Sequence, residues 1–272
     1  MAKKKDPYTG YKALKFDRPA DRVLRVSLNR PEVFNAVSPT MHDELINLWA
    51  KIDKDDDTSV VILCGAGKAF SAGADINDAG QLYKDFNEVM KTWRGIHDHV
   101  YNFINFSKPV VSAMHNVAVG AGLTLGVLAD VVIVSPDLRI IDGHTRVGVT
   151  AGDHSAMIWP LLCGMAKAKY YLLSSKPLMG EEAERIGVAT FCVPLDELQD
   201  KAVEVAKDLA MMPPTAVRTT KYSLNNWLRT FGPHLDASLG LEMLGWTGHE
   251  SKEGVKSLQE KRDGDWDPYS PM

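Results

Sequence analysis

The order of apolar and polar residues divides the chain into an alternating part and a helical part. Apolar positions alternate with polar ones from Val23 to Leu28, as in a strand with one buried face. Val60 to Cys64 is a continuous apolar run, which is typical of a buried parallel strand. The other elements predicted up to residue 195 are helices over about 40–53, 78–106, 123–129 and 181–186, and strands over about 109–114, 130–135 and 189–193. Strands and helices that alternate in this way predict βαβ units and an α/β fold.

The pattern changes beyond Leu195, where no further strand is predicted. Helical stretches follow at about 196–211, 215–230, 233–247 and 250–262, separated by prolines and glycines. We therefore divide the chain into an α/β core, residues 1–195, and a C-terminal helical region, residues 196–272. Apolar helices such as Leu235 to Trp246 often bury themselves against a partner subunit, so we expect this region to join subunits.

Composition excludes several classes of protein. The 272 residues are 45% hydrophobic and 24% charged, and no apolar run approaches the roughly 18 residues of a membrane span. The first residues lack the apolar segment of a secretory signal, so we expect a cytoplasmic globular protein without membrane contact. A net charge of -4 gives no reason to expect nucleic acid as a partner. The three cysteines lack metal-ligand spacing, so no metal site is predicted.

Two turns rich in glycine and alanine are the first candidates for a functional site. The first glycine turn is residues 67–76, which come shortly after the predicted strand from Val60 to Cys64. The second glycine turn is residues 120–122, which come shortly after the predicted strand over about 109–114. Glycine lets the backbone bend tightly, and small side chains let a ligand approach the main chain. The amides around Ala121 would lie at the N-terminus of a helix, where negative charge is favoured.

The chain resembles the crotonase (enoyl-CoA hydratase/isomerase) superfamily in the order of several short motifs. These motifs are Asn29-Arg30-Pro31 with Asn35-Ala36, Phe70 to Asp75, Lys108 to Gly122, Glu181 to Gly187, and Glu253-Gly254 through Glu260-Lys261-Arg262. The resemblance spans nearly the whole chain. It implies a crotonase-like spiral of ββα units with a C-terminal helical trimerisation region, and trimers that often pair into hexamers.

The resemblance implies an enzyme for acyl-CoA thioesters without a separate cofactor, because coenzyme A is part of the substrate. The thioester carbonyl would lie between the backbone amides of Ala74 and Ala121, which would stabilise an enolate. The residues expected to contact the substrate are Ala72, Asp75, Ile76, Gly120, Thr124 and Lys261. Other polar or aromatic residues could line the pocket or belong to the core: His115, His154, Trp159 and Glu242.

Two positions depart from the family hydratases, which carry a pair of glutamates there. Thr124 and His144 match these positions, and only His144 can exchange a proton near neutral pH. Asp153 is the candidate carboxylate that would accept a ring N–H and fix the tautomer of His144. It could also cap the helix that is expected to begin after it. Acid or base action by His144 predicts an ionisation at about pH 6 to 8.

The pair of His144 and Asp153 also resembles the β-diketone hydrolase branch typified by 6-oxocamphor hydrolase. Dehalogenase relatives use an aspartate at the Asp153 position as a nucleophile. Three functions therefore remain open. The first is an enoyl-CoA hydratase-like enzyme with His144 and Asp153 in place of the glutamates, which the Ala-Gly-Ala-Asp-Ile turn favours. The others are a hydrolase of a carbon–carbon bond in a β-diketone or β-ketoacyl-CoA, and a non-catalytic protein that binds CoA or RNA.

Overall fold

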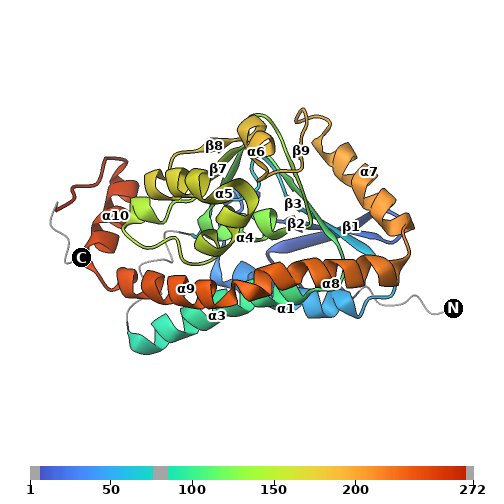
Figure 1. Cartoon of the computed structure of the whole chain (residues 1–272), viewed down its shortest axis with the longest axis horizontal. Helices are drawn as coiled ribbons and strands as arrows, with labels where there is room; N and C mark the ends of the chain where they lie inside the picture. The colour runs from blue at the N-terminus through green and yellow to red at the C-terminus, as the bar shows by residue number, and fades with distance from the viewer. Residues whose placement is uncertain (1–6, 76–84, 268–272) are drawn as a thin grey trace.

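A six-stranded sheet runs through the protein in the computed structural model, which describes residues 7–75 and 85–267 (Figure 1). Its strands, in their order across the sheet, are β1 (Leu14–Ala20), β2 (Val23–Leu28), β3 (Val60–Gly65), β4 (Val110–Met114), β6 (Val131–Val134) and β9 (Phe191–Cys192). All neighbouring pairs are parallel except β1 with β2. A second sheet has the order β5 (Val117–Val119), β7 (Arg139–Ile141), β8 (Leu178–Met179).

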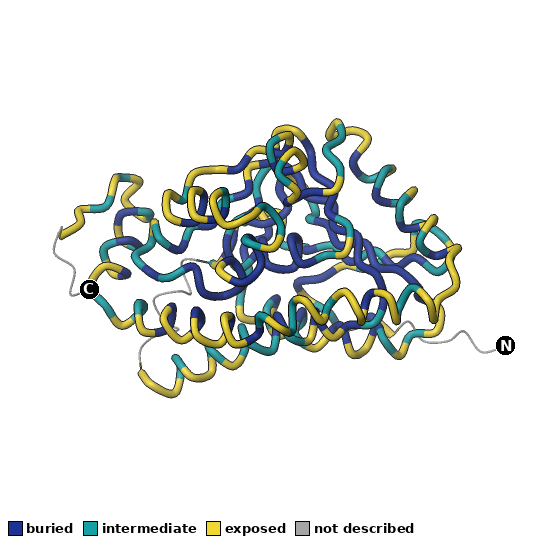
Figure 2. Tube along the Cα trace, in the orientation of Figure 1, coloured by how far each residue is buried: buried dark blue, intermediate teal, exposed yellow. Residues whose placement is uncertain are grey.

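Helices cover both faces of the six-stranded sheet. The bounds are α1 (Pro39–Asp53), α3 (Phe86–Asn105), α4 (Gly120–Leu128), α5 (Ser155–Ser174), α6 (Gly180–Ile186), α7 (Leu198–Met211), α8 (Pro214–Thr230), α9 (Gly232–Trp246) and α10 (His249–Glu260), with 3-10 turns η1 (Pro31–Val33) and η2 (Thr145–Val147). α7 packs on one face, where its buried alanines meet Val60 and Ile62. α1, α3 and α4 contribute to the larger core on the other face. The buried residues concentrate in the strands between these layers (Figure 2).

The α/β class predicted from the pattern is confirmed. The strand from Val23 to Leu28 has the predicted bounds, and the strand that starts at Val60 ends one residue later than predicted, at Gly65. Residues 14–20, for which the pattern predicted no element, form β1. This strand lies at the edge of the sheet and leaves most of its residues partly or fully exposed, so it lacks a clear apolar pattern.

The C-terminal helices reach back across the core. α9 packs against α3 and α5, and α10 packs against η2 (Figure 1). α7 closes the sheet of the first region, and we keep the division of the chain at residues 195 and 196 as a proposal. In the described part of the chain, no helix combines the length and apolar character of a membrane span.

Candidate active site

Asn35 and Arg30 hold the first glycine turn in place. The Asn35 side chain is fully buried, and its amide nitrogen donates to the carbonyls of Ala66 at 2.9 Å and Ala69 at 2.8 Å. Its oxygen accepts from the backbone N–H of Arg30 at 2.8 Å. The Arg30 guanidinium forms an ion pair with Asp75 at 3.2 Å. The predicted substrate contact Asp75 is thus tied to the Asn-Arg-Pro motif.

The two glycine turns lie in direct contact. The backbone N–H of Ser71 donates to Val117 O at 3.1 Å, and that of Val119 donates to Ser71 O at 3.1 Å. A Cβ atom on Gly122 would overlap the Ser71 side chain, and one on Gly73 would lie 3.0 Å from Val119 O. Glycine at these positions therefore allows the turns to touch.

Within residues 7–75 and 85–267, the amides of Ala74 and Ala121 take no part in the backbone hydrogen bonds around them. Ala74 forms a parallel bridge with Val37, in which Val37 N donates to Gly73 O at 2.8 Å and Asp75 N donates to Val37 O at 3.1 Å. These two hydrogen bonds are made by the residues on either side of Ala74, so the N–H of Ala74 itself points away from Val37. Ala121 is the second residue of α4, where an amide has no acceptor within the helix. Both amides can therefore bind an oxygen atom.

A buried group of polar side chains, the His144 cluster, lies beside the second glycine turn. Its members are Asp142, His144, Asp153, His154, Ser155 and Glu242. β5 and β7 are parallel, and Val119 pairs with Ile141, so Gly120 and Asp142 follow these strands at the same edge. The shared edge brings the cluster next to α4.

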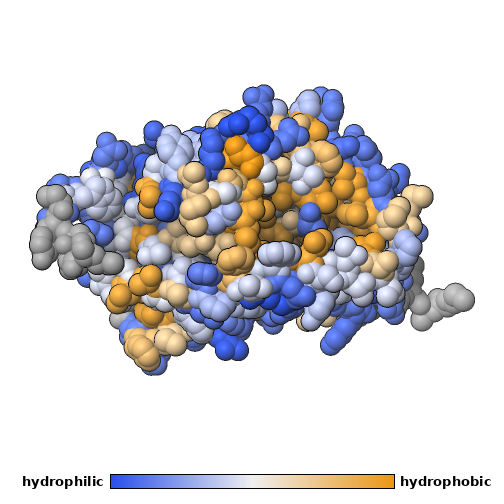
Figure 3. Space-filling view, in the orientation of Figure 1, coloured by the Kyte–Doolittle hydropathy of each residue, from blue (hydrophilic) through white to orange (hydrophobic). Residues whose placement is uncertain are grey.

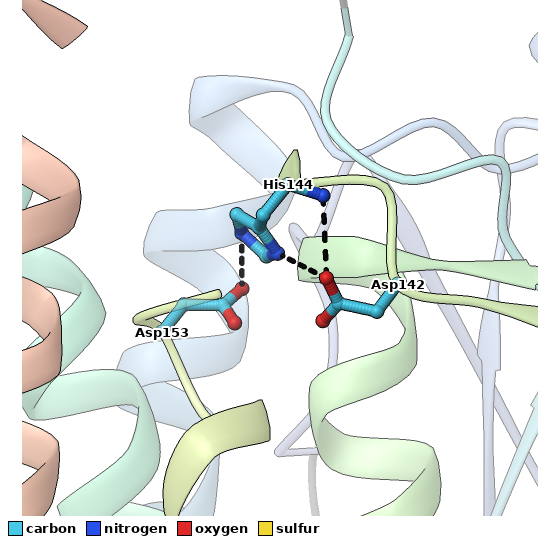
Figure 4. Close-up of side chains that lie close together, drawn as sticks. All are labelled: Asp142, His144 and Asp153. Carbon is cyan, nitrogen blue, oxygen red and sulfur yellow. Dashed lines mark hydrogen bonds and ion pairs between the residues drawn. The ribbon is translucent and has the colours of Figure 1, made fainter. Parts of the chain in front are cut away.

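His144 lies between two carboxylates (Figure 4). Its Nδ1 is 3.0 Å from Asp142 Oδ1, and its backbone N–H donates to the same oxygen at 3.2 Å. Its Nε2 is 3.6 Å from Asp153 Oδ2. Asp142, rather than the expected Asp153, is therefore the carboxylate that accepts a hydrogen bond from the ring. Aspartate two residues before a histidine was the signal in the sequence that could have identified it.

Asp153 bonds to the next residue instead. Its Oδ1 accepts from His154 Nδ1 at 2.6 Å. The N-cap of α5 is His154, and no side chain caps this helix. The prediction that Asp153 caps the helix is therefore wrong, because its carboxylate is turned into the cluster.

His154 fills the space next to Thr124 on α4. Its Nδ1 lies 3.2 Å from Thr124 Oγ1, and its Nε2 lies 3.1 Å from Ser155 Oγ. The Ser155 hydroxyl donates to Asp142 Oδ2. The ring of contacts closes through Asp142, His144, Asp153, His154 and Ser155. A closed polar ring fixes the orientation of His144 inside the core.

The surrounding carboxylates keep His144 positively charged. Burial acts to lower its pKa, but Asp142, Asp153 and Glu242 raise the pKa of His144 well above its ordinary value of 6.5. Burial acts to raise the pKa of Asp142, and His144 holds that pKa below its ordinary value. The ionisation expected for His144 at about pH 6 to 8 therefore moves to higher pH, because the imidazolium is stabilised by the carboxylates.

Glu242 completes the cluster from α9. Its Oε1 accepts from Trp246 Nε1 at 3.2 Å and lies 3.8 Å from His144 Nε2. Burial first, and then Asp153 and Asp142, raise the pKa of Glu242 to about 7, against the opposing effect of His144. An acid placed directly between Leu241 and Met243, inside a mainly apolar stretch, was the sequence signal for this residue.

The same cluster is the candidate for a cation among the described residues. Asp142, His144 and Asp153 each offer one ligand atom, and these atoms lie within 4.8 Å of one another. Both nitrogens of His144 already face carboxylates, and its raised pKa means that it holds a proton. A cation would have to displace that proton, so the arrangement favours a cluster that stores protons.

Other residues predicted for the site are dispersed. Ala72 is exposed, and its N–H donates to Phe34 O at 2.8 Å. Lys261 is exposed at the end of α10, in the left-handed conformation. Ile76 lies outside the described residues. Among the described residues, the ion pairs of His144 do not include Lys261.

Two of the possible pocket residues lie elsewhere. His115 donates from its Nε2 to Gly67 O at 3.0 Å. It also lines a cavity of about 980 Å³ on the face covered by α7, together with Arg25 and Cys64. Trp159 is fully buried, and its ring lies 6.2 Å from that of Tyr171. Neither belongs to the His144 cluster.

Residues 19–268 match the family model described as enoyl-CoA hydratase/isomerase. A mevalonyl-coenzyme A hydratase of Beauveria bassiana is 30% identical over 91% of this chain and 92% of its own. A 1,2-epoxyphenylacetyl-CoA isomerase of Escherichia coli is 28% identical over 88% of this chain and 93% of its own. The crystal structure of an enoyl-CoA hydratase/isomerase from Mycobacterium paratuberculosis superimposes with a TM-score of 0.85 at 30% identity, covering 90% of this chain and 98% of that one.

Proposed function

The chain belongs to the enoyl-CoA hydratase/isomerase family, whose crotonase fold it shares, and we propose that it is an enzyme that acts on an acyl-CoA thioester. One observation carries this proposal. The contact between the two glycine turns leaves the amides of Ala74 and Ala121 free beside a buried cluster of acids and imidazoles. Coenzyme A is part of the substrate, so no separate cofactor is required.

The two amides form an oxyanion hole in this proposal. The thioester oxygen accepts hydrogen bonds from Ala74 N and Ala121 N, and negative charge develops on it as an enolate forms. The N-terminus of α4 adds partial positive charge at Ala121. Each preorganised donor of this kind is worth about 3 kcal/mol of transition-state stabilisation.

His144 and Asp153 take the place of the usual glutamate pair. The imidazolium of His144 can give a proton to the enolate carbon, and Asp153, 3.6 Å away, stabilises its charge. The reaction favoured is addition of water to an enoyl-CoA. Burial of this many polar side chains costs folding free energy, which favours a catalytic protein over a non-catalytic binding protein.

The second candidate reaction is hydrolysis of a carbon–carbon bond in a β-diketone or β-ketoacyl-CoA. The observation that favours it is the replacement of a glutamate by Thr124, whose hydroxyl faces the imidazole of His154 at 3.2 Å. Water would attack a carbonyl carbon, and the departing carbon would take the proton of His144. This reaction uses the same cluster as hydration does.

A turnover assay with three substrates tests the proposed function. The purified protein is offered a short 2-enoyl-CoA, a β-ketoacyl-CoA and a β-diketone without CoA, and products are separated by chromatography. We expect turnover of a CoA thioester, with the enoyl-CoA preferred. Turnover of the β-diketone alone would replace the first candidate with the second. No turnover of any of the three would contradict the proposed function.

We also propose that the protein forms a homotrimer or a dimer of trimers. Apolar side chains gather on the face shown in Figure 3, around α9 and in the hollow that α5, α7 and α8 surround. Large apolar side chains are exposed along α5, α8 and α9: Leu161, Met165, Tyr170, Leu173, Tyr222, Leu224, Trp227, Leu241 and Leu244. Light scattering at micromolar concentration is expected to give three or six times the 30.0 kDa of the chain. A stable monomer would contradict this assembly.

A further inference from the structure

Glu242 lies inside the protein with one carboxylate oxygen unpaired. The residue is only 3% exposed. Its Oε1 is held by Trp246 and lies 3.8 Å from His144 Nε2. Its Oε2 has no hydrogen-bond partner among the described residues. A buried oxygen without a partner carries an unmet demand for a hydrogen bond, so Glu242 is suited to bind a reacting water or substrate group.

The loop before α5 brings Glu242 into place. A Cβ atom on Gly152 would lie 2.7 Å from the Glu242 Cβ and 2.9 Å from its Oε2. Only glycine permits this close approach, and the next residue is Asp153. The two carboxylates therefore flank the same nitrogen of His144, at 3.6 Å from Asp153 and 3.8 Å from Glu242.

The charged groups that face Glu242 are His144, Asp142 and Asp153. Asp142 and His144 come from the residues after β7, and Asp153 comes from the loop before α5. The helix α3 also packs on α9, but its His97 lies 3.7 Å from Asp236, one to two turns before Glu242. Burial and the two carboxylates disfavour a further negative charge on Glu242, against the opposing effect of the His144 imidazolium. Glu242 therefore exchanges its proton near neutral pH, in a range where His144 does not.

We propose that Glu242 is a catalytic residue that takes the proton from the attacking water, while His144 acts as the proton donor. This inference rests on the proposed function. In hydration, Glu242 accepts one proton as the water oxygen bonds to the β carbon, and the electron pair of the double bond moves onto the thioester oxygen. His144 then gives its proton to the α carbon. The proton on Glu242 passes to the neutral His144, which restores both groups.

The same proton removal serves carbon–carbon hydrolysis. Glu242 accepts a proton as the water oxygen bonds to a carbonyl carbon. The bond to the neighbouring carbon then breaks, and that carbon takes its proton from His144. Both candidate reactions therefore require an ionised Glu242 and a charged His144. This pairing predicts activity that rises as the pH rises through about 7.

The substitution Glu242→Gln tests the proposal because it keeps the shape and removes the ionisation. For the wild type we expect the rate to rise about tenfold from pH 6 to 8, following ionisation of one group. In Glu242→Gln we expect this rise to vanish and kcat to fall by about 100- to 10,000-fold. Glu242→Asp should keep the pH dependence at a lower rate. Asp236→Asn, an exposed acid on the same helix, is the control and should leave both unchanged.

Thermal unfolding gives a readout that does not depend on turnover. The pKa of Glu242 is raised from 4.5 to about 7 in the folded protein, so the folded protein binds this proton more tightly than the unfolded chain does. The resulting stabilisation is present at low pH and is lost as the pH rises. The Tm of the wild type relative to Glu242→Gln should therefore fall as the pH rises from about 4.5 through about 7. A constant difference in Tm, or a pH–rate profile that survives in Glu242→Gln, would overturn the role of Glu242. Absence of turnover in the wild type would instead contradict the proposed function. The Tm measurements at different pH values would still show whether Glu242 ionises near pH 7 in the folded protein.

Discussion

His144→Ala is expected to lower kcat by about 100- to 10,000-fold on every substrate that the wild type turns over, because it removes the proton donor of the cluster. The substitution would also remove the imidazolium between Asp142 and Asp153. Against the effect of burial, this group lowers the pKa of Asp142, and together with His154 it lowers the pKa of Asp153. Loss of one partner from a buried charged group costs about 3–5 kcal/mol of stability. Steady-state kinetics and denaturant unfolding on the same preparation measure both effects.

Two variants make this result specific to His144. His249→Ala removes an exposed histidine at the start of α10 and should leave kcat and stability unchanged. Asp142→Asn keeps the imidazole but weakens its hydrogen bond at Nδ1, so it should lower the pKa of His144 and shift the alkaline limb of the pH–rate profile toward lower pH. A fully active, folded His144→Ala protein would show that the imidazole is structural.

Ala121→Pro is expected to lower kcat by about 100- to 1,000-fold, because it deletes one amide of the oxyanion hole. Proline is tolerated in the first turn of a helix, where the amide lacks an acceptor within the helix. Ala121 is the second residue of α4, directly after Gly120. Kinetics with the preferred CoA thioester measure the loss, and circular dichroism shows whether the fold is kept.

Glu181→Pro is the matched control for this substitution. Glu181 is exposed and is the second residue of α6, which also begins with a glycine, Gly180. A proline there should leave kcat unchanged while placing the same restriction on the backbone. Wild-type rates in a folded Ala121→Pro protein would remove its amide from the mechanism.

Local patterns predicted the strands of the six-stranded sheet apart from β1, but not the second sheet of β5, β7 and β8. The alternation from Val23 to Leu28 and the apolar run that begins at Val60 reflect which faces of a strand are buried, and the structure confirms both strands. The glycines of the two turns indicated tight bends and room for a ligand at the main chain. The structure adds that Gly73 and Gly122 let the two turns touch. The edge strand β1 was not predicted, because most of its residues are partly or fully exposed and the sequence therefore lacks a clear apolar alternation there.

The hydrogen-bond partners in the candidate site depended on tertiary structure. The sequence singled out His144 and offered Asp153 as its carboxylate, but the ring hydrogen bond goes to Asp142. Glu242 enters from α9, and no periodicity reveals which remote segment will lie against an imidazole.

The sequence by itself determined the fold class, the glycine turns and the presence of a titratable histidine, because these follow from residue type and short-range spacing. Only the tertiary structure decided the protonation of that histidine. The pKa of His144 depends on three carboxylates brought within a few ångströms by β7, the loop before α5 and α9. Electrostatic interactions in a buried site vary with distance and desolvation, and both are properties of the packed chain.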